Sequence, residues 1–139
     1  MYYWGESLNC AWHLGVLRMI CNLNATFLIN SAAHMWGYKP YDKSLLPAQN
    51  LTVSILSAGE GFHNYHHTFP LDYRAAELGN NGFNLATLFI DLFAKIGWAY
   101  DLKTTSKEII AARQTRTGDG TDLWGNPLDE IKENSKILI

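Results

Sequence analysis

The distribution of apolar residues predicts one long helix near the start of the chain. The segment from about Trp4 to Trp36 contains no proline, and positions 8–29 are mostly apolar. A run of this length is enough to cross a bilayer, which takes about 20 helical residues. Four polar side chains interrupt it: His13, Arg18, Asn22 and Asn24. The residues alone leave two alternatives open, a transmembrane helix and a buried helix of a soluble protein.

Glycine and proline divide the remainder of the chain into shorter elements. Positions 37–47 predict a connector, because they begin with Gly37 and contain two prolines, which interrupt regular structure. Further helices are expected over positions 50–58, 84–98 and 105–116. The last of these begins with Thr105 and Glu108 at the spacing of a capping box.

The composition excludes several functional classes. The formal net charge is −2 at pH 7, and nothing points to a nucleic-acid partner. Cys10 and Cys21 lie inside the apolar segment without the spacing of a framework, which argues against a secreted disulfide scaffold. The chain also contains no glycine-rich phosphate loop, no Ser-His-Asp set and no paired-cysteine zinc motif.

The histidines give the strongest chemical signal. Three of the five lie within five positions, His63, His66 and His67, in the stretch G-E-G-F-H-N-Y-H-H-T-F-P. On a helix, positions i, i+3 and i+4 share one face, so these imidazoles could converge on a metal ion. Imidazole suits iron, copper, zinc and nickel, so the cluster does not fix the metal. A solvated surface patch is the alternative, but the flanking glycines and aromatic residues favour a metal site.

A second pair of polar residues adds to this signal. Asn30 and His34 are spaced i, i+4, and small residues between them would allow a metal centre to approach closely. An asparagine oxygen can bind a metal directly or hold a metal-bound water. Glu60 is a candidate acceptor for the N–H of a ligand imidazole, with an ordinary exposed glutamate as the alternative.

The helix expected over 84–98 has a narrow polar stripe and otherwise apolar faces. Asp91 and Lys95 lie four residues apart within the stripe, a favourable spacing for an ion pair. At about 22 Å the helix is short for a membrane span. We expect it to cover the core that carries the metal site, or to lie against a membrane surface.

Three stretches resemble the carboxy-terminal part of membrane-bound acyl-CoA desaturases of the delta-9, stearoyl-CoA type. They are N-S-A-A-H-M-W-G-Y-K-P-Y-D (30–42), G-E-G-F-H-N-Y-H-H-T-F-P (59–70) and R-T-G-D-G (116–120). The likeness runs from about Trp4 to Gly120. The family carries three histidine boxes and this chain has only the third, so we expect a carboxy-terminal fragment.

The resemblance implies an all-α fold and a location in the membrane of the endoplasmic reticulum. Positions 1–36 would form a transmembrane helix that extends into the cytosol, and 37–120 a cytosolic helical region with the third histidine box. Positions 121–139 would form a flexible tail. The complete protein would be multi-pass, in contact with membrane lipid.

The distribution of Lys and Arg predicts the orientation of the long helix. Neither residue precedes the apolar stretch, whereas Lys39, Lys43 and Arg74 follow it. The positive-inside rule then places everything after the helix, including the histidine box, in the cytosol. A helix of about 50 Å exceeds a hydrocarbon core of about 30 Å, so its last turns can carry Asn30 and His34 out of the bilayer.

The resemblance also implies the chemistry and the roles of particular residues. The metal ligands would be His34, His63, His66, His67 and, through a water, Asn30. A di-iron centre of Fe2+ would use O2 to insert a cis double bond into a saturated fatty acyl-CoA. Electrons would come from NADH through its reductase and cytochrome b5. Thr26 and Phe27 would lie near the acyl tunnel, with simple helix packing as the alternative.

Two other functions remain as alternatives. A fatty-acid hydroxylase-like membrane oxygenase also uses clustered histidines, but the flanks at 59–62 and 68–70 argue against it. A truncated, non-catalytic membrane remnant beginning at Met1 would hold at most part of a two-metal site. The enzyme expected is a stearoyl-CoA 9-desaturase-type oxidoreductase, with this fragment inactive by itself.

Overall fold

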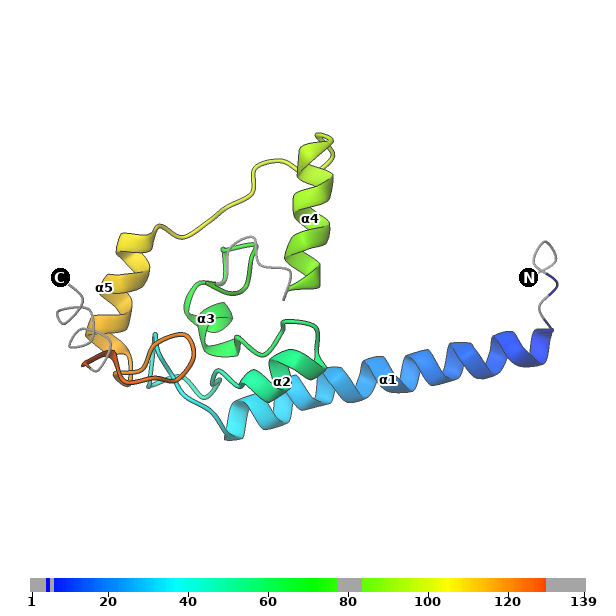
Figure 1. The fold of residues 1–139 in the computed structure, drawn as a ribbon, viewed down its shortest axis with the longest axis horizontal. Coiled ribbons are helices and arrows are strands. Elements are labelled where there is room, and N and C mark those ends of the chain that lie inside the picture. Colours follow the sequence, from blue (N-terminus) through cyan, green and yellow to red (C-terminus); the bar gives the residue numbers. More distant parts are fainter. Residues whose placement is uncertain (1–4, 6, 78–83, 130–139) are drawn as a thin grey trace, which may run out of the picture.

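The computed structural model describes residue 5, residues 7–77 and residues 84–129, and its regular structure is helical (Figure 1). The helices are α1 (Leu8–Met35), α2 (Leu51–Leu56), α3 (His63–Thr68), α4 (Leu85–Lys95) and α5 (Lys107–Thr117). The described ranges contain isolated β-bridges but no β-strand. The all-α prediction is therefore confirmed for this part of the chain.

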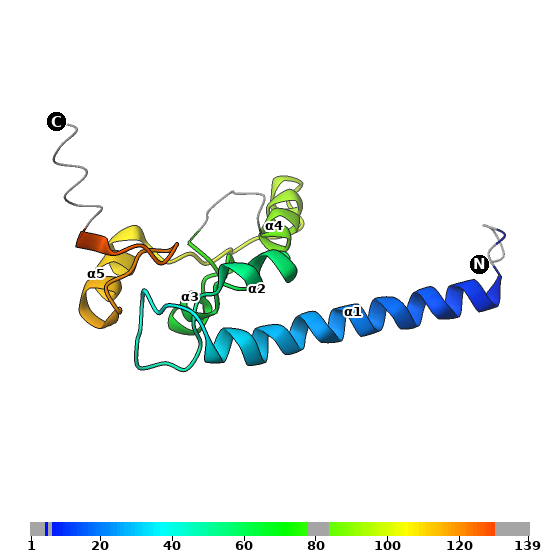
Figure 2. The same ribbon diagram turned by 60° about the horizontal axis from the view of Figure 1, so that its bottom comes forward.

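The long helix α1 projects from the rest of the described chain along most of its length (Figures 1 and 2). Ser7 caps its start, because the Ser7 hydroxyl accepts a hydrogen bond from the Cys10 N–H at 3.1 Å. The helix therefore begins at Leu8 and not near Trp4, which lies outside the described residues. Near the other end, Ala33 is buried against the body of the protein.

None of the helices in the described ranges is both long enough and apolar enough to cross a membrane, so the span expected within 1–36 is not found. With 28 residues, α1 is about 42 Å long and its length is sufficient. Its mean hydropathy is lower than a membrane span requires, because polar side chains interrupt the apolar run at His13, Arg18, Asn22 and Asn24.

The connector after α1 folds back between the end of that helix and the start of α3. The Ala48 N–H donates to the Ala33 carbonyl at 2.6 Å. Gln49 forms antiparallel bridges with Tyr38 on one side and Phe62 on the other. Residues 37–49, which contain the connector expected over 37–47, thus hold α1 and α3 at a fixed distance from each other.

Two glycines are required where these segments approach. A Cβ atom at Gly37, which has φ +140°, would lie 2.1 Å from the backbone oxygen of Gln49. A Cβ atom at Gly61 would lie 2.3 Å from the backbone nitrogen of Ser54 in α2. A larger residue at either position would push the connector or α2 away from the segment that leads into α3.

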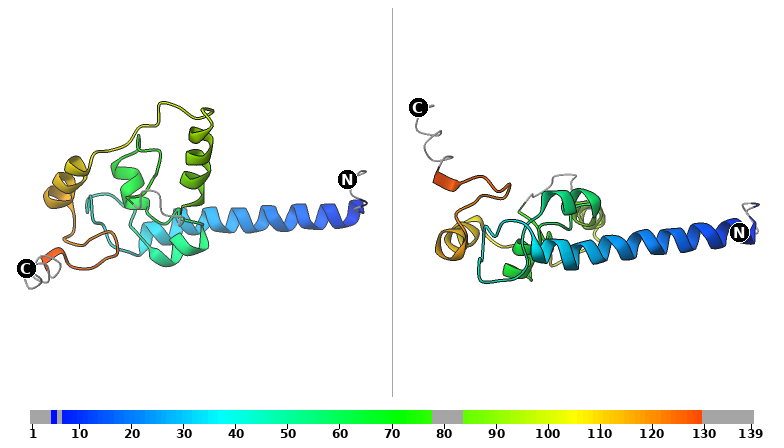
Figure 3. Two further views of the ribbon diagram at one scale, coloured as in Figure 1. Left: turned by 45° about the horizontal axis from the view of Figure 1, so that its top comes forward. Right: turned by 90° about the horizontal axis from the view of Figure 1, so that it is seen from below.

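The six-residue helix α3 lies between α5 and α4 (Figures 1 and 3). A helix this short is not stable by itself, and Asn64 attaches it to the connector. The fully buried Asn64 side chain accepts from the N–H groups of Tyr41 and Asp42 at 3.0 and 3.2 Å. It also donates to the carbonyls of Asp42 and Pro47, both at 2.9 Å.

Asp72 connects α3 to the segment that precedes α5. Its carboxylate accepts from the Tyr65 hydroxyl at 2.8 Å and from the Thr105 N–H at 2.7 Å, and it forms an ion pair with Arg74. Because Asp72 holds Thr105 in this way, the cap of α5 is Ser106 and not the expected Thr105. The helix expected from 105 accordingly begins two residues later.

The fourth helix is shorter than the expected 84–98. Asn84 caps it by accepting from the Thr87 N–H at 3.0 Å, and the same side chain donates to the Arg74 carbonyl at 2.9 Å. Asp91 accepts from the Tyr73 hydroxyl at 2.7 Å. It forms no ion pair with Lys95 in the described part of the chain, so that expectation was wrong.

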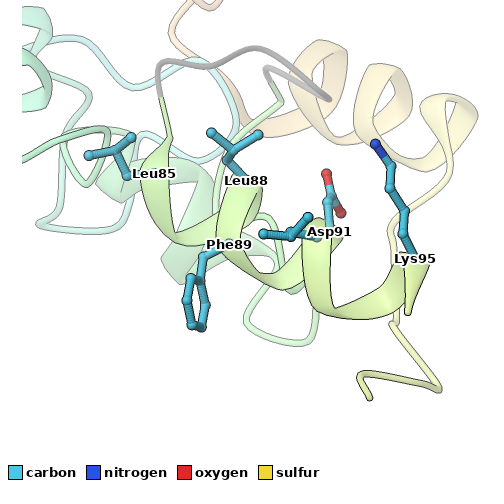
Figure 4. A pocket seen from close by; sticks show the side chains of 6 residues that line it. Leu85, Leu88, Phe89, Asp91 and Lys95 are labelled. Carbon is cyan, nitrogen blue, oxygen red and sulfur yellow. The ribbon is translucent and has the colours of Figure 1, made fainter. Parts of the chain in front are cut away.

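One face of α4 is apolar and exposed (Figure 4). Side chains of this helix line a surface pocket there: Leu85, Leu88, Phe89, Asp91, Leu92 and Lys95. Phe89 is 62% exposed and Leu92 57% exposed. Nothing in the described ranges covers this face, which leaves open the choice between a membrane surface and further protein.

The R-T-G-D-G stretch fastens the end of α5 to the connector. The Thr117 hydroxyl donates to the Tyr41 carbonyl at 2.6 Å, and the Asp119 N–H donates to the Lys39 carbonyl at 3.1 Å. A Cβ atom at Gly118 would lie 2.0 Å from the carbonyl oxygen of Pro40, so only glycine allows this approach.

The segment expected to be a flexible tail, 121–139, is described only up to residue 129. Residues 121–129 form a hydrogen-bonded turn in which Thr121 pairs with Pro127. Leu123 packs against Phe62, and Trp124 meets the Phe62 ring edge to face at 6.4 Å between centroids. This part is packed because Phe62 offers it an apolar contact, and positions 130–139 lie outside the described residues.

We predict that Asp72→Asn destabilises the protein by about 3 kcal/mol, the cost of breaking a buried ion pair on one side. Burial opposes ionisation of Asp72, but hydrogen bonds from Arg74, Thr105 and Tyr65 outweigh it and lower its pKa to about 2. The stabilisation is therefore present above pH 4 and lost as the pH falls from about 4 towards 2. Urea unfolding at pH 7 and at pH 3 measures both effects.

Asp101→Asn is the matched control for this prediction. Asp101 is paired with Lys103, but its side chain is 78% exposed, and exposed pairs contribute little to stability. The control should unfold close to the wild type at both pH values. If Asp72→Asn unfolded at the same urea concentration as the control at both pH values, the role given to Asp72 would be contradicted.

Candidate metal centre

Three histidines from two helices converge at one point in the structure. The ligand nitrogens of His34, from α1, and of His63 and His67, from α3, all lie within 4.8 Å of one another. The ring centroids are 4.5 Å apart for His63 and His67 and 4.9 Å apart for His34 and His63. The Nε2 atoms of His63 and His67 are separated by 3.2 Å. The predicted convergence of the two sequence segments is present in the structure.

The donor set fits a metal ion. His34 Nε2 is buried and has no hydrogen-bond partner, although buried polar atoms in proteins are almost always partnered. His63 is 9% exposed, and its Nε2 faces another imidazole nitrogen. A divalent cation between these nitrogens would satisfy the unpartnered atom of His34 and replace the hydrogen bond between the Nε2 atoms of His63 and His67 by coordination.

The charge state of the cluster favours metal binding. Burial, together with the neighbouring His67, His34 and His66, lowers the pKa of His63 to about 4. Burial also lowers the pKa of His67, with His66 and His34 contributing. Both rings are therefore neutral at pH 7, which is the form that binds a metal. Neutral imidazoles suit several transition metals, so geometry alone does not select iron.

Two further candidate ligands lie beside the cluster. His66 is exposed, and its ring centroid is 5.9 Å from that of His63 and 5.5 Å from that of His67. Asn30 is exposed one turn before His34, and its side-chain nitrogen donates to the Thr26 carbonyl at 3.0 Å. Neither belongs to the group of three converging imidazoles, and their roles as ligands remain predictions.

The remaining candidate residues lie on exposed surfaces. Glu60 is exposed on the loop before α3, and its contact with a ligand imidazole remains a prediction. Thr26 is exposed on α1, and its hydroxyl donates to the Asn22 carbonyl at 3.0 Å. Phe27 is 64% exposed. The structure places Thr26 and Phe27 about two turns before His34, and the proposed tunnel role remains a prediction.

The sequence reasoning missed the residues that hold α3 in place. Asn64 and Tyr65 lie between the histidines and are fully buried. A signal for Asn64 existed, because asparagine is a poor helix former and its presence inside a short helix needs another reason. The contact of Asp72 with Thr105 gave no local signal, since these two residues lie 33 positions apart.

Comparison with known proteins gives the class to which these features belong. The chain is 67% identical over 125 residues to an acyl-CoA Delta(11) desaturase of Spodoptera littoralis, covering 90% of this chain and 37% of the relative. It is 56% identical over 127 residues to an acyl-CoA Delta-9 desaturase of Acheta domesticus, covering 90% and 35%. It is 53% identical over 121 residues to stearoyl-CoA desaturase 5 of Bos taurus, covering 86% and 36%. No family model matches the chain.

The chain is therefore homologous to the acyl-CoA desaturases, which confirms the resemblance carried by its three sequence stretches. It spans little more than a third of the length of the relatives that it matches. The names of these relatives differ in the position of the double bond, so the expected delta-9 specificity is not confirmed.

We predict that His63→Ala abolishes binding of a divalent metal by the full chain, whereas His66→Ala weakens it much less. His63 is the ring closest to both other members of the cluster, and His66 is exposed beside it. The affinity should fall by more than about 100-fold for His63→Ala, because loss of an outer partner alone costs 10- to 100-fold. Titration with Co2+, followed by its absorption spectrum, measures this. Equal losses in the two variants would contradict the three-histidine grouping.

Proposed function

We propose that this chain supplies part of the iron site of an acyl-CoA desaturase, an oxidoreductase that inserts a cis double bond into a saturated fatty acyl-CoA. The observation that carries the proposal is the convergence of His34, His63 and His67. Homology to enzymes named as acyl-CoA desaturases supports the substrate class. The position of the double bond is left open.

The cofactor that the proposal requires is a di-iron centre of Fe2+. Iron would supply the activation of O2 needed to remove hydrogen from an unactivated methylene pair, which no side chain can do. Three imidazole ligands from this chain would hold iron at the junction of α1 and α3. His66 and, through a water, Asn30 would contribute to the same centre, and Glu60 would accept a hydrogen bond from the N–H of a ligand imidazole.

The chain's own residues position the site and exclude water from one side of it. Asn64 and Asp72 fix α3, so the imidazoles of His63 and His67 keep their geometry without a metal. Tyr65 of α3 packs in a buried cluster with Tyr41, Phe69 and Ile110, and this cluster excludes water from that side of the helix. Electrons would reach the site from NADH through its reductase and cytochrome b5.

We propose that α1 lies among apolar helices or lipid in the endoplasmic reticulum membrane, with the histidine site facing the cytosol. Several of its polar side chains form hydrogen bonds within the helix, to carbonyls four residues earlier. Asn24 donates to the Ile20 carbonyl at 2.8 Å, and Thr26 donates to the Asn22 carbonyl at 3.0 Å. Internal bonds of this kind allow polar side chains in apolar surroundings. The exposed apolar side chains along α1, such as Trp12 at 70%, need such surroundings.

We predict that the complete protein restores unsaturated fatty acids to yeast that lacks its own desaturase, and that His63→Ala reduces the product to background. The matched control is His13→Ala, because His13 is exposed on α1 and its ring contacts the Asn9 carbonyl of the same helix. Gas chromatography with mass spectrometry identifies the product. A hydroxylated fatty acid would favour the hydroxylase alternative, and no product from the wild type would favour the non-catalytic remnant.

We predict that Thr26→Phe in the complete protein changes the position of the double bond or the preferred chain length. A larger side chain in an acyl tunnel changes which carbon pair can reach the metal. Thr115→Phe on α5 is the control, since Thr115 is also exposed and also donates to a carbonyl four residues earlier. The product distribution over several chain lengths is the measurement. An unchanged distribution would remove the tunnel role of Thr26.

A further inference from the structure

A surface groove lies between the end of the histidine helix α3 and one face of α5. Four residues of α5 share that face because they follow the helical spacing i, i+3, i+4 and i+7. They are Ile109, Ala112, Arg113 and Arg116, and Thr68 and Phe69 complete the lining. The groove has a volume of about 380 Å³, which is enough to take in several side chains of another protein.

The two arginines give this groove a positive charge that is only partly neutralised. Arg113 forms an ion pair with Asp42 and its side chain is 31% exposed, but its Nε has no hydrogen-bond partner among the described residues. Arg116 is exposed and forms no ion pair within the described ranges. Glu108 is exposed on the same helix, but about a quarter of a turn away from this face. Since guanidinium groups bind carboxylates at two points, the groove favours an acidic partner.

Apolar residues form the rest of the groove. Phe69 belongs to the buried cluster beneath it, whereas Ile109 and Ala112 are exposed on α5. Arginine and aromatic side chains beside apolar surface are the combination that is enriched in protein–protein interfaces. A single inorganic ion would use only the charges of the groove, while a protein partner would use its apolar part as well.

The groove lies next to the histidine site and far from the start of α1. Thr68, which lines it, directly follows His67 in α3. Figures 1 and 2 show α5 at the opposite end of the described chain from the first turns of α1. In the arrangement proposed above, those first turns lie in the membrane, so the groove would face water and a soluble partner could reach it.

Desaturation requires electrons that the acyl chain does not supply. Reduction of O2 to two waters takes four electrons and four protons, and removal of two hydrogen atoms from the acyl chain gives two of each. The other two electrons must come from an external donor, and the other two protons from solvent. Because electron transfer through protein slows steeply with distance, the donor has to dock close to the histidines.

We propose that the groove between α3 and α5 is the docking site of an acidic electron-donor protein. The proposal rests on the desaturase function proposed above, which creates the need for a donor. Carboxylates of the donor would pair with Arg113 and Arg116, and one of its apolar side chains would cover Ile109 and Ala112. Transient electron-transfer complexes have small interfaces of this kind, in which charge acts mainly on the rate of association. The electron would enter the protein beside His67.

The test measures binding of the soluble haem domain of cytochrome b5, the donor named in the proposed function, to the complete protein in detergent. Acyl-CoA is left out, so the result does not depend on turnover, and biolayer interferometry gives the Kd. Arg116→Glu should weaken binding about tenfold at roughly 50 mM NaCl, and only about twofold at roughly 300 mM, because salt screens exposed charges. Arg116 is chosen over Arg113 because Arg113 also holds Asp42.

A second variant and a matched control separate the groove from general charge effects. Ala112→Trp fills the groove without changing the charge, and the exposure of Ala112 allows the larger side chain. It should also weaken binding about tenfold, but equally at both salt concentrations. Lys95→Glu makes the same change of charge on α4, outside the groove, and should alter the Kd by less than about twofold. Equal effects of Arg116→Glu and Lys95→Glu, or no effect of Ala112→Trp, would overturn the docking site.

The same variants distinguish other occupants of the groove. ADP and phosphatidylserine vesicles are tested beside the haem domain. If Arg116→Glu lost affinity for one of these while it kept its affinity for the haem domain, the groove would be a site for an organic phosphate or a lipid, and the donor proposal would be wrong.

The binding measurement also separates the docking site from the proposed function. Desaturation by the complete protein, together with a Kd that Arg116→Glu leaves unchanged, would leave the enzyme function standing and remove the docking site. Weaker binding by Arg116→Glu and Ala112→Trp, in a protein that forms no unsaturated product, would keep the docking site and remove the desaturase function.

Discussion

The hydrogen bonds of the buried Asn64 side chain are the interaction on which the rest of the structure depends. A six-residue helix has too few internal hydrogen bonds to persist alone. Asn64 supplies four bonds to the connector, two accepted from backbone N–H groups and two donated to carbonyls. Because the connector is also bonded to the end of α1, these contacts fix His63 and His67 relative to His34. A metal site shared between two helices requires a link of this kind.

The other polar contacts extend this link to the remaining helices. Asp72 joins α3 to the start of α5. The side chain of Asn84, which caps α4, donates a hydrogen bond to the carbonyl of Arg74, the ion-pair partner of Asp72. The R-T-G-D-G stretch closes the arrangement by bonding the end of α5 to the connector beside Asn64. The body around the histidines is thus held mainly by polar side chains that bond to distant backbone, while its apolar clusters are small.

The sequence predicted the helices and the histidine cluster because both follow from spacing. The i, i+4 spacing of His63 and His67 is enough to place them on one helical face, and the predicted positions of α2, α4 and α5 follow from their apolar patterns and caps. The contacts of Asn64, Asp72 and Thr117 were not predictable, because bonds between a side chain and a distant backbone group produce no periodic pattern. The cap of α5 was misassigned for the same reason, since a contact from Asp72 decides it.

The packing of three imidazoles explains why the site is suited to a cation other than the proton. Protons on His34, His63 and His67 together would place positive charges within 4.8 Å of one another in a partly buried site, where repulsion is strong. Burial and repulsion from neighbouring rings lower the pKa of His67 and lower that of His63 to about 4, so these two rings are neutral at pH 7. A metal ion meets the same three nitrogens as lone-pair donors and displaces few protons at neutral pH. The fold thus brings the three imidazoles together before any metal has bound, in a geometry that disfavours their protonation and favours binding of a metal ion.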